Sequence, residues 1–243
     1  MKPILFNTEM VRAILEDRKK VTRRLIKLKY GNTHHEMFTN KYGTRLIEIQ
    51  NDVEGETFGK NADGSTWRKL RGYIEPKAPY KKSDILYVRE TWLKADDGLH
   101  YKADIQVPSE SEDLRKAYGY KWHPSIHMPK EAARIFLRVI EVRAERIQDI
   151  TNKEAKKEGI IVETNNSGLM HKLKYSELWN SIYSQPQPVK TKGIITHYES
   201  YPWEDIHETR EHNGLPWYVY GNPWVWVIEF EQISKEDAYG RSN

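Results

Sequence analysis

Residues 224–230 constrain the fold more than any other part of the chain. In this run Trp224, Trp226, Ile228 and Phe230 alternate with Val225, Val227 and Glu229. Successive side chains of a β-strand point to opposite faces, so this alternation is the clearest strand pattern in the sequence. We expect residues 224–230 to form a central strand of a sheet.

Three further segments carry a strand pattern, at residues 45–49, 85–92 and 134–142. The segment 134–142 is rich in β-branched residues and is long enough to cross the wall of a barrel. We find no internal repeat and no glycine-rich phosphate loop. The separated strands favour an α+β mixed β-barrel with flanking helices and polar insertions over a doubly wound sheet.

Helical patterns lie between the strands. Apolar residues at helical spacing predict a first helix over residues 8–17, with Asn7 or Thr8 as its N-cap. A capping box that begins at Thr151 and a natural stop at Gly159 predict a short helix over residues 152–158. A third helix is indicated by an apolar stripe of Tyr175, Leu178, Trp179 and Ile182.

The chain is polar for its length of 243 residues. Hydrophobic residues make up 38% and the mean hydropathy is -0.82, so much of the chain must lie in solvated loops rather than in a core. We interpret residues 1–243 as a single decorated domain. Its predicted core is 1–30, 83–93, 131–183 and 222–233, and its predicted insertions are 31–80, 94–121 and 185–220.

Several classes of protein are excluded by what the sequence lacks. No run approaches the roughly 18 apolar residues that cross a bilayer, and the first residues are too short for a secretory signal. We therefore expect a cytoplasmic location and no membrane partner. The chain has no cysteine, which excludes disulfides, a thiolate nucleophile and cysteine-based metal sites.

A metal site is not expected either. His34, His35 and Glu36 invite a metal interpretation, but no third ligand stands at a telling distance from the two histidines. We expect these three residues on the surface of an insertion, and we expect no cofactor.

Basic residues gather near the N-terminus although the formal net charge is only +4. Residues 12–29 carry eight lysines and arginines against Glu16 and Asp17. Such an excess attracts phosphates by Coulomb attraction and counterion release, and it is also compatible with a solvated basic face. The eight Trp and fifteen Tyr include candidates for base stacking, although most should be ordinary core and rim residues.

Lys19 and Thr22 form the first candidate catalytic pair. They lie three residues apart, so their side chains share a face if the turn after the first helix stays helical. Neighbouring cations and partial burial lower a lysine pKa, and a neutral Lys19 would take a proton from Thr22 or from water. The alternative is a common surface spacing without a role.

Glu158 is the second candidate. It falls in the last turn of its short helix, where the negative end of the helix dipole disfavours a carboxylate. A carboxylate in that position suits general acid/base work. The alternative is a surface glutamate neutralised by Lys156 or Lys157.

Other candidates lie in two places along the chain. One place is the end of a predicted strand, at the expected opening of the barrel, where Arg89, Glu90 and Trp92 lie. The alternative is that the Arg–Glu pair there has only a structural role. Residues 122–129 offer a stacking ring and polar donors from Trp122, His123, Ser125 and His127, or they form a loop that packs its own aromatic residue.

Four separated blocks resemble the ASCH family of PUA-like proteins. Residues 14–24 (ILEDRKKVTRR) resemble its signature of a helix that ends in a Gly-Arg-Lys-like turn followed by Thr and Arg, although Asp17 stands where glycine is usual. Residues 83–88 (SDILYV), 155–159 (AKKEG) and 223–230 (PWVWVIEF) resemble its strand, its helix and its closing strand. Residues 122–129 (WHPSIHMP) resemble phage and prophage members.

The resemblance implies a fold and a site. It implies a PUA-like β-barrel whose cleft takes a nucleobase, a modified nucleoside or nucleic acid. In the ASCH amidohydrolases that deacetylate N4-acetylcytidine, the catalytic Lys, Thr and Glu match Lys19, Thr22 and Glu158. Arg24 matches a family arginine that would orient the carboxylate or a phosphate.

Three functions follow as alternatives. The first is metal-free hydrolysis of an N-acylated cytosine-type base, with Lys19 as base, Thr22 as nucleophile or water holder and Glu158 as proton shuttle. The second is a non-catalytic reader of RNA or DNA. The third is a ribonuclease that uses the same cleft. In the reader, phosphates are held by Lys19, Lys20, Arg23 and Arg24.

Overall fold

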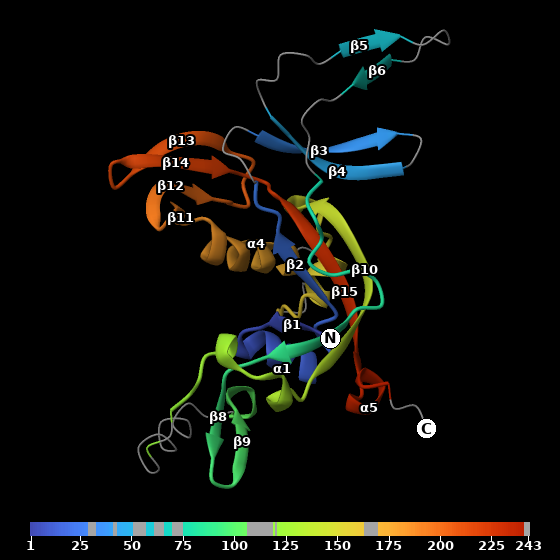
Figure 1. Cartoon of the computed structure of the whole chain (residues 1–243), viewed down its shortest axis with the longest axis vertical. Coiled ribbons are helices and arrows are strands. Elements are labelled where there is room, and N and C mark those ends of the chain that lie inside the picture. The colour runs from blue at the N-terminus through green and yellow to red at the C-terminus, as the bar shows by residue number, and fades with distance from the viewer. Residues whose placement is uncertain are drawn as a thin grey trace.

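The computed structural model describes residues 1–28, 33–40, 43–50, 57–60, 66–69, 75–105, 119, 121–162 and 170–240 (Figure 1). Its main sheet has five strands in the order β1-β7-β10-β15-β2. Their bounds are Lys2–Leu5 for β1, Ile85–Arg89 for β7, Phe136–Arg146 for β10, Trp224–Ile233 for β15 and Val21–Leu25 for β2. The β1–β7 pair is parallel and the other pairs are antiparallel.

Strand β15 is central, as its alternation predicts, because β10 and β2 pair with its two edges. Its two faces enter different cores. Trp226, Ile228 and Phe230 pack with Phe6 and residues of β10 in one core, whereas Val225 and Val227 pack on the other face. The alternation of β15 therefore separates two hydrophobic layers on opposite faces of the same sheet.

Helices cover both faces of this sheet. Helix α1 (Thr8–Leu15) begins at Asn7, whose side chain accepts a hydrogen bond from the Met10 amide, and it buries Val11 and Ile14 in the Phe6 core. Helices α3 (Asn152–Lys157) and α4 (Met170–Tyr183) cover the Val225 face. The remaining helices in the described residues are η1 (Lys102–Asp104), η2 (Ser125–His127), η3 (Lys130–Ala132), η4 (Ile147–Asp149) and α5 (Lys235–Ala238).

The predicted insertions contain ordered sheets of their own. Residues 185–220 form a four-stranded sheet in the order β11-β12-β14-β13, and the other three sheets are two-stranded pairs. The bounds are β11 Gln187–Thr191, β12 Ile194–Ser200, β13 His207–His212 and β14 Leu215–Tyr220. The pairs are β3 (Thr33–Asn40) with β4 (Gly43–Gln50), β5 (Thr57–Lys60) with β6 (Thr66–Lys69), and β8 (Trp92–Ala95) with β9 (Gly98–Tyr101).

Two predicted boundaries are wrong for physical reasons. Residues 85–92 do not form one strand, because β7 ends at Arg89 and the chain re-pairs as β8 from Trp92. The amide of the intervening Glu90 contacts the Met128 sulfur at 3.1 Å instead of joining the main sheet. The first helix ends at Leu15 rather than at 17, because Asp17 has a left-handed φ of +56°.

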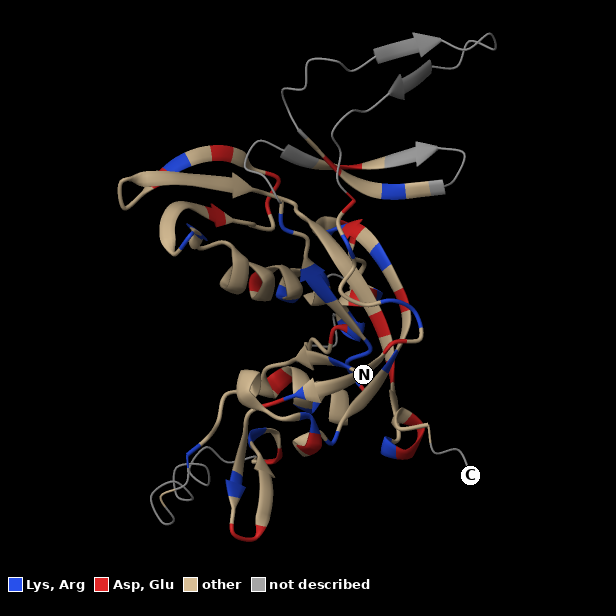
Figure 2. Ribbon diagram, viewed as in Figure 1, with Lys and Arg blue, Asp and Glu red and all other residues tan. Residues whose placement is uncertain are grey.

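The prediction of an α+β fold is confirmed, but the predicted closure is not observed. Among the described strands, β1 and β2 are the two edges of the five-stranded sheet and do not pair with each other. Figure 2 shows the basic segment of β2 at the centre of the molecule, between α4 and α1, whereas acidic and basic residues alternate along β10. The single-domain organisation stays a prediction.

Candidate functional site

A cavity of about 380 Å³ lies between α1 and α4, and we call it the Lys19 cavity. Strand β2 contributes Thr22 and Arg24 to its lining, and α4 contributes Trp179 and Tyr183. Lys19 and Glu158 also line it. The three candidate catalytic side chains therefore face one concave space, and each is more than nine-tenths buried. Their role stays a prediction.

The segment after α1 brings Lys19 to this cavity. The amides of Arg18 and Lys19 both donate to the Ala13 carbonyl, at 2.8 and 2.9 Å, and reverse the chain. Lys19 then forms an isolated antiparallel bridge with Glu158. The expected helical face shared by Lys19 and Thr22 is therefore wrong, because Thr22 is the second residue of β2. The left-handed Asp17 supplies the turn, which explains why glycine suits that position.

The end of α3 places Glu158. Thr151 and Glu154 form the predicted capping box, and Glu158 is the C-cap. Gly159 follows with a φ of +91°, and a Cβ atom there would lie 2.7 Å from the Cβ of Ala13. Only glycine allows α1 and the end of α3 to approach this closely, so Gly159 fixes the distance between the two halves of the site.

Lys19 and Glu158 form a buried ion pair. The Lys19 Nζ lies 2.7 Å from Oε2 of Glu158 and also donates to its carbonyl at 3.0 Å. The side chains are 1% and 4% exposed. The other carboxylate oxygen of Glu158 accepts from Arg23 Nη1 at 3.2 Å. Glu158 is thus not the surface residue that the alternative interpretation described.

Arg23 is the centre of a charge network that the sequence did not reveal. Its side chain is fully buried and also lies 3.3 Å from Glu145 and 3.4 Å from Glu154. Arg143 contacts Glu145 and Glu154 from the other side. Because three carboxylates surround the Arg23 guanidinium, neither it nor Lys19 is available to bind phosphates.

Burial changes the proton affinity of Lys19. Desolvation lowers its pKa, since the charged form loses water; the Glu158 carboxylate opposes this effect, and Arg24 and Arg23 add to it. On balance the pKa lies below its ordinary value of 10.5. The amine is therefore easier to deprotonate than a surface lysine, which is the property required of a general base.

The Thr22 hydroxyl has no hydrogen-bond partner among the described residues, although its residue is only 2% exposed. It lines the cavity beside Lys19. A hydroxyl in the lining of a cavity with no hydrogen-bond partner in the described part of the chain is left to bind a ligand or a cavity water.

Helix α4 supplies an aromatic wall. The rings of Trp179 and Tyr183 lie 4.3 Å apart at 34°, and Trp179 Nε1 donates to the Tyr201 carbonyl at 2.8 Å. Burial raises the pKa of Tyr183, so its ring stays a neutral phenol. The predicted apolar stripe of this helix is divided: Tyr175 and Trp179 are buried, while the exposed Ile182 borders the cavity.

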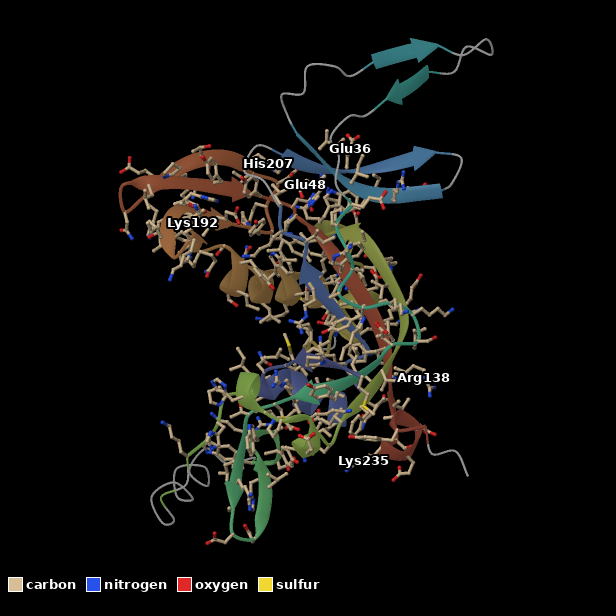
Figure 3. All side chains as sticks on the ribbon, in the orientation of Figure 1. Glu36, Glu48, Arg138, Lys192, His207 and Lys235 are labelled. Carbon is tan, nitrogen blue, oxygen red and sulfur yellow. The ribbon has the colours of Figure 1, made fainter. Side chains whose placement is uncertain are left out.

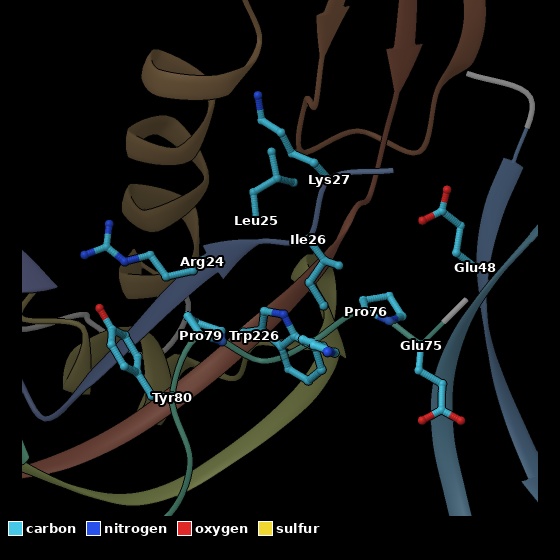
Figure 4. A pocket seen from close by; sticks show the side chains of 11 residues that line it. Arg24, Leu25, Ile26, Lys27, Glu48, Glu75, Pro76, Pro79, Tyr80 and Trp226 are labelled. Atoms are coloured by element: carbon cyan, nitrogen blue, oxygen red, sulfur yellow. The ribbon is translucent and has the colours of Figure 1, made fainter. Parts of the chain in front are cut away.

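Arg24 differs from its neighbour Arg23. Its Nη2 donates to the Leu5 carbonyl at 2.7 Å and its Cζ lies 5.4 Å from the centre of the Phe6 ring. No carboxylate pairs with it among the described residues. Arg24 also lines a second cavity of about 620 Å³, which includes Trp226, Tyr80, Lys27 and Lys77 and which we call the Trp226 cavity (Figure 4).

Most of the basic segment is neutralised locally. Lys20 pairs with Asp17 at 2.9 Å, and Arg18 contacts Glu16. Lys20 does not line the Lys19 cavity. Most cations of the segment are paired, while Arg24 and Lys27 have no acidic partner in the described part of the chain. The attraction of phosphates stays a prediction. Lys29 lies outside the described residues.

The second group of predicted site residues lies away from both cavities. Arg89 Nε donates to the Met128 carbonyl at 2.7 Å, and Glu90 is buried against Arg134 at 2.9 Å. The Trp92 and His123 rings lie 5.0 Å apart across an isolated bridge. None of these lines either cavity, and the same holds for Trp122, Ser125 and His127. The structural interpretation of the Arg–Glu pair agrees with this placement, although Glu90 pairs with Arg134 rather than with Arg89.

The position of His35 contradicts the prediction that it lies on the surface. It is buried rather than exposed, because β3 pairs with β4 and sets His35 opposite Glu48, with His35 Nε2 3.8 Å from Glu48 Oε2. Within the described ranges, no group of three or more His, Cys, Asp or Glu side chains could hold a metal ion. None of the described helices is both long and apolar enough to cross a membrane.

Comparisons of the chain with protein-family models, with curated proteins and with solved structures gave no match.

Proposed function

We propose that this chain is an ASCH-type, PUA-like protein that hydrolyses the acyl amide of an N-acylated cytosine-type nucleoside without a metal. One observation carries the proposal: Lys19, whose pKa is lowered by burial, lies 2.7 Å from the Glu158 carboxylate in a cavity that the Thr22 hydroxyl also faces. The α+β fold and the four ASCH-like motifs support it.

The shape of the Lys19 cavity suits a nucleoside. Its volume of about 380 Å³ falls within the range of roughly 300–1,000 Å³ found for small-molecule sites. A flat base would lie along the Trp179 and Tyr183 rings, because aromatic stacking is favourable for every base. Its acylated exocyclic nitrogen would then face the polar end of the cavity, where Lys19 and Thr22 lie.

The reaction uses the proton that Lys19 and Glu158 share. Transfer of this proton from Nζ to Oε2 leaves a neutral amine beside a carboxylic acid. Thr22 Oγ1, or a water that it holds, attacks the acyl carbonyl carbon while the Lys19 amine takes the proton of the attacking hydroxyl. The C–N bond then breaks as Glu158 donates its proton to the departing nitrogen.

The products are balanced in both routes. Direct attack by water yields the carboxylic acid and the free exocyclic amine. Attack by Thr22 first yields a threonine ester. A second proton transfer from Lys19 to Glu158 then prepares the pair, and a water hydrolyses the ester as Lys19 takes the water proton and Glu158 returns its proton to Thr22 Oγ1. In either route Lys19 ends as an ammonium and Glu158 as a carboxylate, which restores the ion pair of the free protein.

The backbone amides of Lys19 and Lys20 are engaged within the protein and are poor oxyanion donors. The amide of Lys19 donates to the Ala13 carbonyl and that of Lys20 to the Lys157 carbonyl, at 2.9 and 2.8 Å. Arg24 is the better candidate, since its Leu5 contact engages a single guanidinium nitrogen. A cation that faces a cavity shielded from water stabilises developing negative charge strongly.

The test is release of cytidine from N4-acetylcytidine by the purified protein. Lys19→Met, Thr22→Val and Glu158→Gln each remove one functional group at nearly constant volume. We expect each to lower kcat by at least about 100-fold. Lys156→Met is the matched control, because Lys156 is an exposed lysine on α3 that does not line the cavity. Folding of every variant is verified by thermal unfolding.

The outcomes separate the three functions. Amine release that is lost in the three variants and kept in Lys156→Met supports hydrolysis. Cleavage of labelled RNA that depends on the same residues would replace it with a ribonuclease. Binding of nucleic acid without any product, unaffected by Glu158→Gln, would leave a non-catalytic reader.

A further inference from the structure

Arg24 lies between two cavities, and this position extends the site beyond a single nucleoside. It lines both the Lys19 cavity and the Trp226 cavity. In Figure 4, Arg24 and Tyr80 lie at one end of the Trp226 cavity, Glu48 and Glu75 lie at the other, and Trp226 lies between them. A ligand that leaves the Lys19 cavity past Arg24 therefore enters a second space.

The cations of the Trp226 cavity have no carboxylate partner among the described residues. Lys27 and Lys77 are exposed, and like Arg24 they have no carboxylate partner in the described parts of the chain. The two acids of the cavity are engaged: Glu48 lies beside His35, and Glu75 pairs with Arg45 at 2.5 Å. The net field along the Arg24 side is positive, which favours phosphate groups there.

The same cavity offers flat apolar surfaces. Trp226 is the cross-strand partner of Arg24, so their side chains project from the same face of the sheet. Trp226 is half-buried and borders the cavity together with Tyr80, whose hydroxyl is held by the Pro3 carbonyl at 2.7 Å. Fixed aromatic rings beside unpaired cations are the combination that single-stranded nucleic acids use for binding.

We infer that the substrate is a single-stranded polynucleotide, with the acylated base in the Lys19 cavity, the adjoining phosphate at Arg24 and the neighbouring nucleotide in the Trp226 cavity. This inference rests on the proposed function and specifies its substrate class. Lys27 and Lys77 then hold the backbone of the neighbouring nucleotide.

The arrangement disfavours a duplex. The polar end of the Lys19 cavity is buried, so a base must leave its stack to reach Lys19, and unpairing costs a few kcal/mol in a duplex. A single strand avoids that cost. A free nucleoside, in turn, would leave the Lys27 and Lys77 cations unused.

The experiment compares N4-acetylcytidine with a tetranucleotide that carries one internal N4-acetylcytosine, as RNA and as DNA, at several salt concentrations. We measure kcat/KM for each substrate and the dissociation constant of the tetranucleotide. The test variant is Lys27→Gln with Lys77→Gln. The matched control is Lys192→Gln with Lys235→Gln, two exposed lysines at remote ends of the molecule that line neither cavity (Figure 3).

We expect the tetranucleotide to exceed the nucleoside in kcat/KM by about tenfold or more at low salt. In the test variant the ratio of the two kcat/KM values should fall most of the way to one. The slope of the logarithm of the binding constant against the logarithm of the salt concentration should become shallower by about 1.4, since each single-strand phosphate contact contributes about 0.7. The control variant should keep both values.

Two results would overturn the inference while leaving the proposed function intact: equal kcat/KM for the two substrates, or a ratio and slope that do not change in the test variant. If no acylated substrate is turned over, the proposed hydrolysis fails on its own. Binding of the tetranucleotide then tests the inference separately. A shallower salt dependence of binding in the test variant, but not in the control variant, supports the inference. An unchanged salt dependence in the test variant refutes it.

Discussion

The two cavities that share Arg24 use charge in opposite ways. In the Lys19 cavity Lys19, Arg23 and Glu158 are buried and paired, since Glu158 accepts from both cations. In the Trp226 cavity Lys27 and Lys77 are exposed, and no acid pairs with them in the described ranges. Paired buried charges define positions and proton affinities, whereas unpaired exposed charges attract anions from solution.

The difference between the two cavities can be tested most directly by replacing one cation in each. Arg23→Met would leave Glu145, Glu154 and Glu158 without their common partner. Removal of one member of a buried ion pair costs about 3–5 kcal/mol, because the remaining charges stay desolvated. Lys27→Met should change the free energy of unfolding by no more than about 0.5 kcal/mol. Urea denaturation measures both, and equal losses would show that the two cavities do not differ in this way.

A second test uses glycine. Gly159 has a left-handed backbone conformation, and the Cβ atom added by Gly159→Ala would clash with the Cβ of Ala13. We therefore expect this variant to lose about 2–4 kcal/mol of the free energy of unfolding. Gly214 also has a positive φ but has open space around it, so Gly214→Ala isolates the backbone cost of about 1–2 kcal/mol. Thermal and urea unfolding should separate the two variants. Equal destabilisation would contradict the close approach of α1 and the end of α3.

The smallest effect concerns pH. The mechanism needs the one proton that Lys19 and Glu158 share, because Lys19 must be neutral as the base while Glu158 holds this proton for the departing nitrogen. We therefore expect kcat/KM to stay level while the pair keeps the proton and to fall about tenfold per pH unit once Lys19 has lost it. Because burial lowers the pKa of Lys19, the fall should begin below 10.5. Binding of the tetranucleotide at the Trp226 cavity should not follow this fall. A profile of kcat/KM that rises with pH across this range would contradict the shared proton.

Local signals in the sequence predict the central part of the fold well. The alternation at 224–230 identifies a central strand, and the capping box at Thr151 identifies the start of α3. Residues 185–220 were interpreted as an insertion although they form a four-stranded sheet. Strands β11 and β13 are mostly exposed, and β12 lacks an apolar alternation, so the pairing of β12 with β14 leaves no local signal.

The candidate site shows the same limit. Lys19 and Glu158 are 139 positions apart, and their spacing cannot reveal that they touch. Only the family resemblance connected them. Nothing in the sequence marked Arg23 as buried, because its three carboxylate partners come from β10 and the two ends of α3. The Trp226 cavity was missed for a related reason, since residues 75–80 lie in a segment that reads as a polar loop.

Strand β2 has a further consequence for handling the protein. In the described sheets it pairs only with β15, so its outer edge carries backbone groups that another molecule could match. Natural sheets protect such edges with cationic side chains, and Arg24, with Lys20 and Lys27 at the ends of the strand, fills this role. Neutralising these cations removes a barrier against self-association. Size-exclusion profiles of variants in this strand should therefore accompany every affinity measured with them.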